Sequence, residues 1–137
     1  MQKKSFLIDT NLFISAFKSG PTKSTELFIK LVKDEDIELI ANSVLIEEYK
    51  RYGKKLGSKS QKFFQIIKDN CTLVDPSKKQ IEECNEFFQN SYADAVHAAS
   101  CLKYGSILLT NDKDFNEIKE SNIIDIWNIS DAIENIL

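Results

Sequence analysis

Residues 107–115 read ILLTNDKDF, in which three apolar strand-forming residues lead directly to Thr110, Asn111 and a pair of aspartates. A second stretch, FLIDTN at residues 6–11, has the same form because its apolar run ends on Asp9. Short apolar runs that stop at turn residues are typical of strands buried in a parallel sheet. Such sheets bind ligands beyond the carboxyl ends of their strands, so both stretches predict acids at a functional edge.

Strand-like and helix-like segments alternate along the rest of the chain. The expected strands are 5–8, 37–41, 71–74, 107–109 and 123–127. The expected helices follow Asn11 and then cover 22–34, 43–56, the segment around Phe63, 81–88, 93–104 and the residues from Ser130. This alternation predicts an α/β fold with a central parallel sheet, and the absence of repeats or linkers predicts a single domain over residues 1–137.

Composition limits the kinds of protein this chain can be. With 137 residues, 42% of them hydrophobic, the chain is long enough for one domain with a real core. Three cysteines without metal-ligand spacing predict reduced thiols. Because no apolar run approaches about 20 residues and the start is too short for a signal peptide, we expect a cytoplasmic protein and no membrane. The net charge of −3 argues weakly against nucleic acid as a partner.

Two further acids are expected to face inward from helices. In the helix predicted for residues 43–56, Glu48 lies roughly 70° from the centre of the apolar face, whereas Glu47 lies roughly 170° away. Asp94 begins a helix that is apolar on nearly all sides, and it projects about 180° from Lys103, which is the clearest solvent-facing residue. An alternative for Asp94 is purely structural, because Ser91 and Asp94 have the spacing of a capping box.

Four carboxylates, on Asp9, Glu48, Asp94 and Asp112, therefore need one explanation. Buried carboxylates that lie close together repel one another, and no lysine or arginine lies within four residues of Asp9 or Asp94. A divalent cation with oxygen ligands, Mg²⁺ or Mn²⁺, is the natural compensation. Such a site performs metal-assisted hydrolysis of phosphodiesters.

Read in order, the motifs FLIDTN, SVLIEEY, ADAVHAASCLKYG and ILLTNDKDF resemble those of the PIN-domain family over nearly the whole chain. The resemblance implies a three-layer α/β/α fold whose acidic pocket binds Mg²⁺ or Mn²⁺ and cleaves RNA, which makes the chain a metal-dependent ribonuclease. Stand-alone domains of this kind are similar to VapC-type toxins, which form homodimers and are neutralised by a cognate antitoxin.

The resemblance also assigns roles to individual residues. The catalytic acids it implies are Asp9, Glu48, Asp94 and Asp112. Our hypothesis is that Asp9 and Asp94, with Asp112 directly or through water, hold the metal, while Glu48 holds a second metal or a metal-bound water. The auxiliary residues are Asn11, Thr110 and Asp114. Asn111 stands where the family often has arginine, so one candidate phosphate contact is missing here.

Two features remain open to more than one interpretation. Between residues 50 and 62 the chain has basic residues and no acid, so Lys50, Arg51, Lys54 and Lys55 are candidates to bind the RNA backbone, or else an ordinary solvated helix end. His97, the only histidine, is expected to be a packed and hydrogen-bonded residue, with a ligand or base role as the alternative.

The rival functions differ in how they use the acids. A haloacid-type phosphatase would need a second aspartate where Asn11 stands, and a receiver domain would need a lysine at the end of a later strand, where Thr110 and Asn111 stand. The more serious alternative is a non-catalytic PIN-like module that binds RNA or protein. Retention of all four acids favours catalysis, because a scaffold has no reason to keep repelling carboxylates together.

Overall fold

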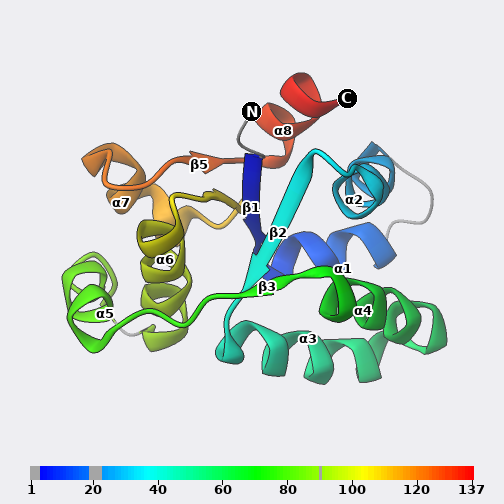
Figure 1. The fold of residues 1–137 in the computed structure, drawn as a ribbon, viewed down its shortest axis with the longest axis horizontal. Coiled ribbons are helices and arrows are strands. Elements are labelled where there is room, and N and C mark those ends of the chain that lie inside the picture. Colours follow the sequence, from blue (N-terminus) through cyan, green and yellow to red (C-terminus); the bar gives the residue numbers. More distant parts are fainter. Residues whose placement is uncertain (1–3, 19–22, 90) are drawn as a thin grey trace.

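A parallel sheet forms the centre of the molecule (Figure 1). The computed structural model describes residues 4–18, 23–89 and 91–137. Within them, five strands pair in the order β3-β2-β1-β4-β5, all parallel. The strands are β1 (Lys4–Ile8), β2 (Ile37–Ala41), β3 (Thr72–Leu73), β4 (Ile107–Leu109) and β5 (Ile126–Trp127). The predicted α/β class with a central parallel sheet is confirmed.

The central strands are buried on both faces. In β1, residues 5–8 are all buried, and Leu108 and Leu109 of β4 are completely buried. Continuous apolar runs suit such strands, since helices cover both sides of a parallel sheet. From β1 the chain builds outward through β2 to β3, and it later returns to place β4 on the other side of β1. This reversal of strand order puts the carboxyl ends of β1 and β4 side by side, with Ile8 paired to Leu109.

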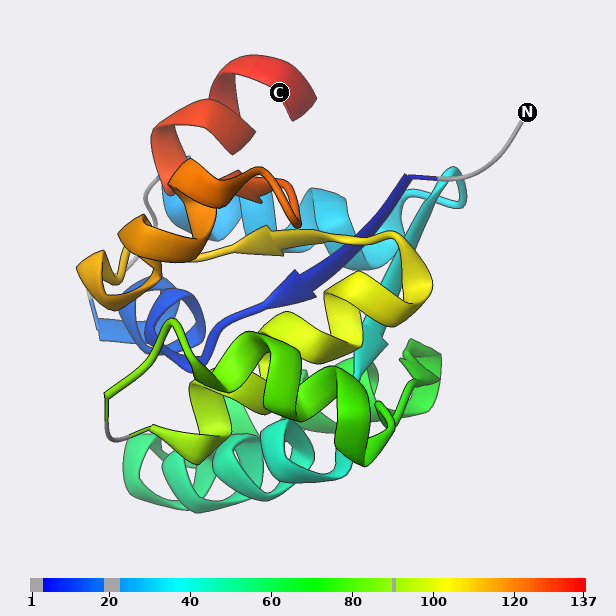
Figure 2. The same cartoon turned by 90° about the vertical axis from the view of Figure 1, so that its left-hand side faces the viewer.

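Helices form the outer layers on the two sides of the sheet. They are α1 (Thr10–Lys18), α2 (Lys23–Lys33), α3 (Ser43–Leu56), α4 (Ser58–Asn70), α5 (Lys78–Asn85), α6 (Tyr92–Tyr104), α7 (Asn116–Ser121) and α8 (Ile129–Ile136). Figure 2 shows α8 on one side of the sheet and α3, α5 and α6 on the other. Helix α2 packs against α8 and β2 on the first side. No helix in the described part of the chain has the length and apolar character to cross a membrane.

Helix α6 lies in the core because small residues allow it to. Its residues 95–101 are all buried. The helix ends at Gly105, which adopts the left-handed conformation at φ 74° and donates its N–H to the carbonyl of Cys101. A glycine reaches this conformation without the strain that a Cβ would cause, so the predicted C-terminus is confirmed.

Helix α5 and strand β5 differ from their predicted ranges by a few residues, and α5 also ends at Asn85 instead of residue 88. Helix α5 begins at Lys78 instead of residue 81, because Ser77 and Gln80 form a reciprocal capping box before any apolar residue is reached. The last strand begins at Ile126 instead of residue 123, because Asn122 ends α7 in a left-handed conformation. Both errors come from following hydrophobic residues where local backbone hydrogen bonding sets the boundary.

Candidate active site

Asp9 and Thr110 meet where β1 and β4 end. The backbone N–H of Asp9 donates to the carbonyl of Leu109 at 3.0 Å, which fixes the two strand ends relative to each other. The Thr110 hydroxyl then donates to Oδ2 of Asp9 at 2.7 Å and accepts the backbone N–H of Asp112 at 3.0 Å. Asp9 and Thr110 are both buried. Thr110 therefore connects the acid at the end of β1 to the turn that holds the acids after β4.

Glu48 reaches the same region from the edge of α3. Its side chain is 16% exposed, whereas that of Glu47 is 74% exposed, so the prediction that separated these neighbours is confirmed. One carboxylate oxygen accepts the hydroxyl of Thr10 at 2.5 Å, and the other lies 3.4 Å from Nε2 of His97. The side chain of Glu48 is thus held at both oxygens by residues of two other helices.

Asp94, Asp112 and Asp114 form a compact trio. Each contributes one carboxylate oxygen to a group in which all three oxygens lie within 4.8 Å of one another. Asp112 begins the short 3₁₀ turn η1 (Lys113–Phe115), and its side chain accepts the N–H of Asp114 at 2.9 Å. This turn brings both aspartates to the N-terminus of α6, where Ser91 caps the helix by accepting the N–H of Asp94.

The trio differs from the predicted metal set in one member. Asp114, expected to be auxiliary, lies with Asp94 and Asp112, whereas Asp9 does not belong to this group of three. In the turn after β4 the side chain of Asp112 accepts the N–H of Asp114, and both carboxylates lie close to that of Asp94. Of the capping box expected as the alternative for Asp94, one half is present, since the Ser91 side chain accepts the backbone N–H of Asp94.

The charges of these acids act on one another, so the acids form one site. Burial raises the pKa of Asp9, the Thr110 hydrogen bond and the charge of His97 oppose this rise, and the charges of Asp94 and Glu48 add to it. Burial raises the pKa of Asp94 in the same way, with the Ser91 hydrogen bond and the charge of His97 opposing the rise and the charges of Asp112 and Asp114 adding to it. A cation with oxygen ligands would relieve this mutual repulsion, so the donor set fits Mg²⁺ or Mn²⁺.

The pKa of Glu48 shifts in the opposite direction to those of Asp9 and Asp94. Burial raises its pKa, but the hydrogen bond from His97 and the charge of His97, followed by the Thr10 hydrogen bond and the charge of Arg51, outweigh burial, and the pKa of Glu48 is lowered. A lowered pKa favours the ionised carboxylate, which can accept hydrogen bonds. The site therefore combines carboxyl groups that resist ionisation with one that favours it.

The two asparagines have separate positions. Asn11 is exposed in the first turn of α1, directly after Asp9 and Thr10. Asn111, where the PIN-domain family often has arginine, is also exposed, and its side chain accepts the N–H of Ile129 at 2.9 Å. Asn111 thus fastens the first residue of α8 to the loop after β4, which is a structural task.

A pocket of about 510 Å³ opens beside the trio. Asp94 and Asp114 line it together with Phe87, Phe88 and Lys113. It offers carboxylates, an ammonium group and aromatic side chains on one concave surface.

The basic candidates lie on the exposed side of α3. Lys50, Arg51, Lys54 and Lys55 are all exposed. Arg51 and Lys55 each place their charge 5.5 Å from the ring of Tyr52, and Lys50 pairs with Glu47 at 3.6 Å. Arg51 also acts electrostatically on Glu48, so the basic patch begins at the acidic site.

His97 is packed, as expected, with 1% of its side chain exposed. The structure adds partners that sequence reasoning missed, namely Thr10 for Glu48, and Asn42 and Ser100 around His97. Of these residues, only Asn42 could have been singled out from the sequence, since an asparagine directly before a predicted helix is a typical N-cap.

Known proteins resemble this chain in sequence pattern and in fold. The family model described as PIN domain matches residues 6–121. No curated protein matches the sequence. VapBC2 from Rickettsia felis, solved with a DNA fragment from its promoter, is 17% identical with a TM-score of 0.66, covering 90% of this chain and 98% of that one.

Two further solved structures have a similar fold. PAE2754 from Pyrobaculum aerophilum is 14% identical with a TM-score of 0.66, covering 97% of this chain and 89% of that one. FitAcB from Neisseria gonorrhoeae is 16% identical with a TM-score of 0.62, covering 91% of this chain and 98% of that one. At these identities the likeness shows a shared fold.

Proposed function

The chain belongs to the PIN domain family, and on this premise we propose that it is a metal-dependent endoribonuclease that hydrolyses phosphodiester bonds of RNA. The observation that supports this most is the gathering of five acids at the carboxyl edge of the sheet, in a setting that raises the pKa of Asp9 and Asp94. Natural sequences rarely keep such repulsion without a use for it.

The proposed residue roles follow from position and charge. Asp9, Asp94 and Asp112 would hold Mg²⁺ or Mn²⁺, and Asp114 lies close enough to Asp94 and Asp112 to assist. The bound ion would lower the pKa of its water and offset charge on the attacked phosphate. Glu48, kept ionised by its hydrogen bonds, can accept a hydrogen bond from the attacking water and so orient it.

The basic patch on α3 supports an anionic substrate. Lys50, Arg51, Lys54 and Lys55 offer positive charge next to Glu48, which counters the net charge of −3 of the whole chain. We expect these residues to contact the RNA backbone without reading its sequence.

Cleavage of a fluorescent single-stranded RNA, with added Mg²⁺, Mn²⁺ or EDTA, tests the proposed activity. Asp9→Asn and Asp94→Asn are each expected to lower cleavage by about 100-fold or more. Glu48→Gln should also be impaired, while the matched control Glu47→Gln should cleave as the wild type does. Cleavage that survives EDTA, or equal cleavage by all variants, would overturn the proposal.

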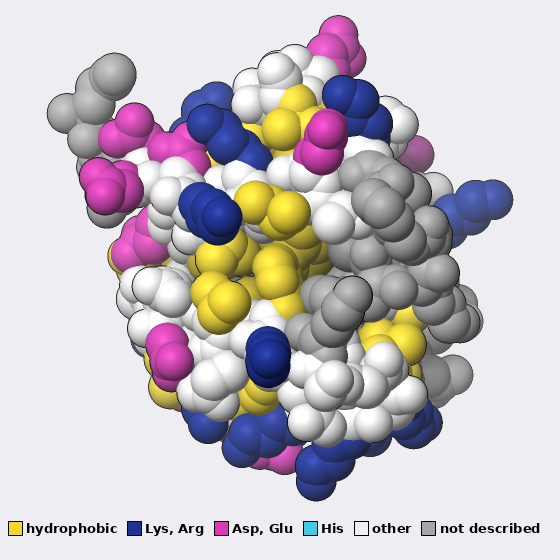
Figure 3. Space-filling model, turned by 90° about the vertical axis from the view of Figure 1, so that its right-hand side faces the viewer, with side chains coloured by type: hydrophobic (Ala, Val, Ile, Leu, Met, Phe, Trp, Pro, Cys, Tyr) yellow, Lys and Arg dark blue, Asp and Glu magenta, His cyan; other side chains and the backbone are white. Residues whose placement is uncertain are grey.

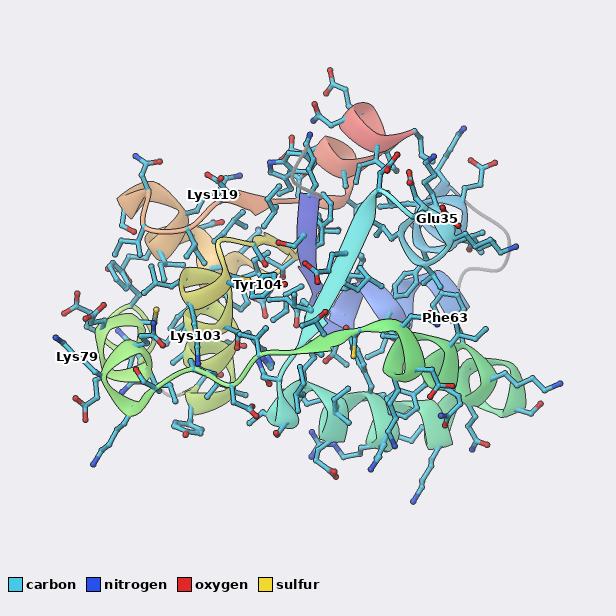
Figure 4. All side chains as sticks on the ribbon, viewed as in Figure 1. Glu35, Phe63, Lys79, Lys103, Tyr104 and Lys119 are labelled. Atoms are coloured by element: carbon cyan, nitrogen blue, oxygen red, sulfur yellow. The ribbon has the colours of Figure 1, made fainter. Side chains whose placement is uncertain are left out.

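RNA affinity at several salt concentrations tests the basic patch. Lys54→Ala with Lys55→Ala should weaken binding and make the salt dependence shallower by about one to two in slope. Lys78→Ala with Lys79→Ala, an exposed pair on α5, is the control (Lys79 is labelled in Figure 4). RNA binding without cleavage by any variant would favour the alternative function, a non-catalytic RNA-binding module.

We also propose that a cognate antitoxin is a protein partner of this chain. The resemblance to VapC-type toxins implies such a partner, and the similarity in fold to VapBC2 and FitAcB supports it. Figure 3 shows apolar side chains gathered on the side of the molecule where α2 and α4 lie. Ile29 of α2 is 43% exposed and Ile66 of α4 is 44% exposed. Between these helices the rings of Phe28 and Phe63 are 4.7 Å apart, and Phe63 is labelled on this side in Figure 4.

The antitoxin proposal has a direct test. The product of a short reading frame beside this gene, if it is the antitoxin, should bind the chain and suppress RNA cleavage. Ile66→Asp should weaken that binding, whereas Ile123→Asp, which changes an equally exposed isoleucine before β5, should not. Equal binding by both variants would contradict the proposed surface. Light scattering will show whether the chain alone is the predicted homodimer.

A further inference from the structure

A buried polar chain connects the end of β2 to Glu48. Its members are Asn42, Ser100 and His97, and of these Asn42 and Ser100 are completely buried while His97 is nearly so. Nδ2 of Asn42 lies 2.9 Å from the Ser100 hydroxyl and 3.1 Å from Nδ1 of His97. Nε2 of His97 then lies 3.4 Å from Oε1 of Glu48. The chain is therefore continuous from the backbone of α3 to the acidic site.

Two neighbours fix which way the Asn42 amide points. The backbone N–H of Leu45 can only donate, and it lies 2.8 Å from Oδ1 of Asn42. The Ser100 hydroxyl donates its single hydrogen to the carbonyl of Val96 at 2.8 Å, so towards Asn42 it can only accept. Both contacts require the Asn42 oxygen to face Leu45 and its NH₂ group to face Ser100 and His97.

The orientation of Asn42 decides the tautomer of His97. The second hydrogen of the Asn42 amide points to Nδ1 of His97, so Nδ1 must present a lone pair. A hydrogen on Nδ1 would face the NH₂ group at 3.1 Å with no acceptor between them. In the neutral ring the hydrogen is therefore on Nε2, which is the nitrogen that faces Glu48.

We propose that His97 is a positioning residue for Glu48, and that Asn42 makes it a hydrogen-bond donor by setting its tautomer. The inference rests on the proposed function, because Glu48 is the residue that would orient water in RNA hydrolysis. Thr10 holds the other carboxylate oxygen, so donors from α1 and α6 together fix a side chain that would otherwise have several free rotations. His97 itself does not touch the substrate, since it is buried.

Nuclear magnetic resonance of ¹⁵N-labelled protein gives a direct reading of the tautomer. His97 is the only histidine, so its two ring nitrogens give an unambiguous pair of signals. At neutral pH we expect a hydrogen on Nε2 and none on Nδ1. Asn42→Asp keeps a cap for Leu45 but replaces the donor by an acceptor, so it should bring a hydrogen onto Nδ1. A hydrogen on Nδ1 in the wild type would overturn the inference.

The contact with Glu48 is read in the same spectra. Glu48→Gln should shift the Nε2 signal of His97, whereas Glu47→Gln should leave it in place. An unchanged Nε2 signal in Glu48→Gln would show that His97 does not hold Glu48. These spectra need no catalysis, so they decide the inference even if the protein cleaves no RNA, in which case the proposed function fails separately.

Kinetics then test the consequence for the reaction. His97→Phe keeps a ring but removes the donor, and it should lower kcat by about 10-fold or more with little change in KM. His97→Gln supplies an amide donor and should recover most of the activity. In the Glu48→Gln background, His97→Phe should cause no further loss, because its effect passes through Glu48. Equal losses in both backgrounds, or a change confined to KM, would refute a positioning role.

Discussion

Thr110→Val removes one oxygen from the centre of the acidic site and changes little else. Valine has nearly the same shape and the same branched Cβ as threonine, so the chain after β4 keeps its conformation. Two hydrogen bonds disappear, the one that Thr110 donates to Asp9 at 2.7 Å and the one that it accepts from the N–H of Asp112 at 3.0 Å. Asp9 and Thr110 are buried, so water does not replace these bonds freely.

The expected loss of stability follows from these two bonds. A hydrogen bond to a charged group contributes about 1.5–3 kcal/mol, and a backbone N–H left without an acceptor costs about 1 kcal/mol more. Thr110→Val should therefore lower the free energy of unfolding by about 2–4 kcal/mol. For a chain of this size each kcal/mol lowers Tm by about 3–4 °C, so the fall should be about 6–16 °C.

Urea and thermal unfolding in EDTA measure this loss, and the chain supplies a matched control. Thr72 also donates to a carboxylate, that of Glu38 at 2.8 Å, but this pair lies half-buried at the edge strand β3. Glu38 keeps a second donor, the hydroxyl of Tyr104. Thr72→Val should therefore cost about 1 kcal/mol or less. Equal losses in the two variants would refute the importance of the Thr110 bridge.

The dependence on pH gives a second check on the same variant. The Thr110 bond holds down the pKa of Asp9 against burial, so its removal raises the folded-state pKa further above the unfolded value of 3.8. The folded variant then binds protons to a higher pH than the wild type does, and its stability falls more as pH rises through that range. The gap between wild type and variant should narrow as pH is lowered toward 3.8. A gap independent of pH would show that the lost bond was not one to a charged Asp9.

Three other substitutions have clear expected outcomes in the same unfolding measurements. Asp9→Asn should raise the free energy of unfolding at neutral pH without metal by about 1 kcal/mol, because it removes a carboxylate whose pKa is raised. This gain should vanish as the pH is lowered toward 3.8. A less stable variant would contradict the repulsion between Asp9 and its neighbouring acids. Gly53→Ala should stabilise α3 by about 0.5–1 kcal/mol, since a Cβ there would meet Phe64 only at 4.0 Å. Gly105→Ala should instead lower the free energy of unfolding by about 1 kcal/mol, because φ at this position is +74°. Changes of the same sign in the two glycine variants would contradict this difference between the two positions.

Several parts of the site could be predicted from sequence because they depend on short-range pattern. Apolar runs that stop at polar residues marked the ends of β1 and β4, and helical periodicity separated Glu48 from Glu47. That the residues after these two strands lie at one edge of the sheet followed from the rule for parallel sheets, and the structure adds the contact of Asp9 with Thr110 there. The boundaries of α5 and β5 were predicted less well, because capping and a left-handed turn set them.

Other parts depend on contacts between residues far apart in the chain. Asp114, expected to be auxiliary, lies with Asp94 and Asp112, while the predicted metal set of Asp9, Asp94 and Asp112 stays a prediction. No local pattern indicates that Thr10 and His97 hold the two oxygens of Glu48. Such contacts join α1, α3 and α6, and their distances depend on how the helices pack on the sheet.

The sequence by itself therefore determined the fold class, the strand ends and the identity of the acids, because hydrophobic periodicity and turn residues act over a few neighbouring positions. The tertiary structure alone decided which carboxylates lie together, which are kept ionised, and which nitrogen of His97 faces Glu48. The physical reason is that repulsion, burial and hydrogen-bond polarity depend on separations of a few ångströms between side chains from different elements. A buried chain of donors and acceptors is fixed only when every member is in place.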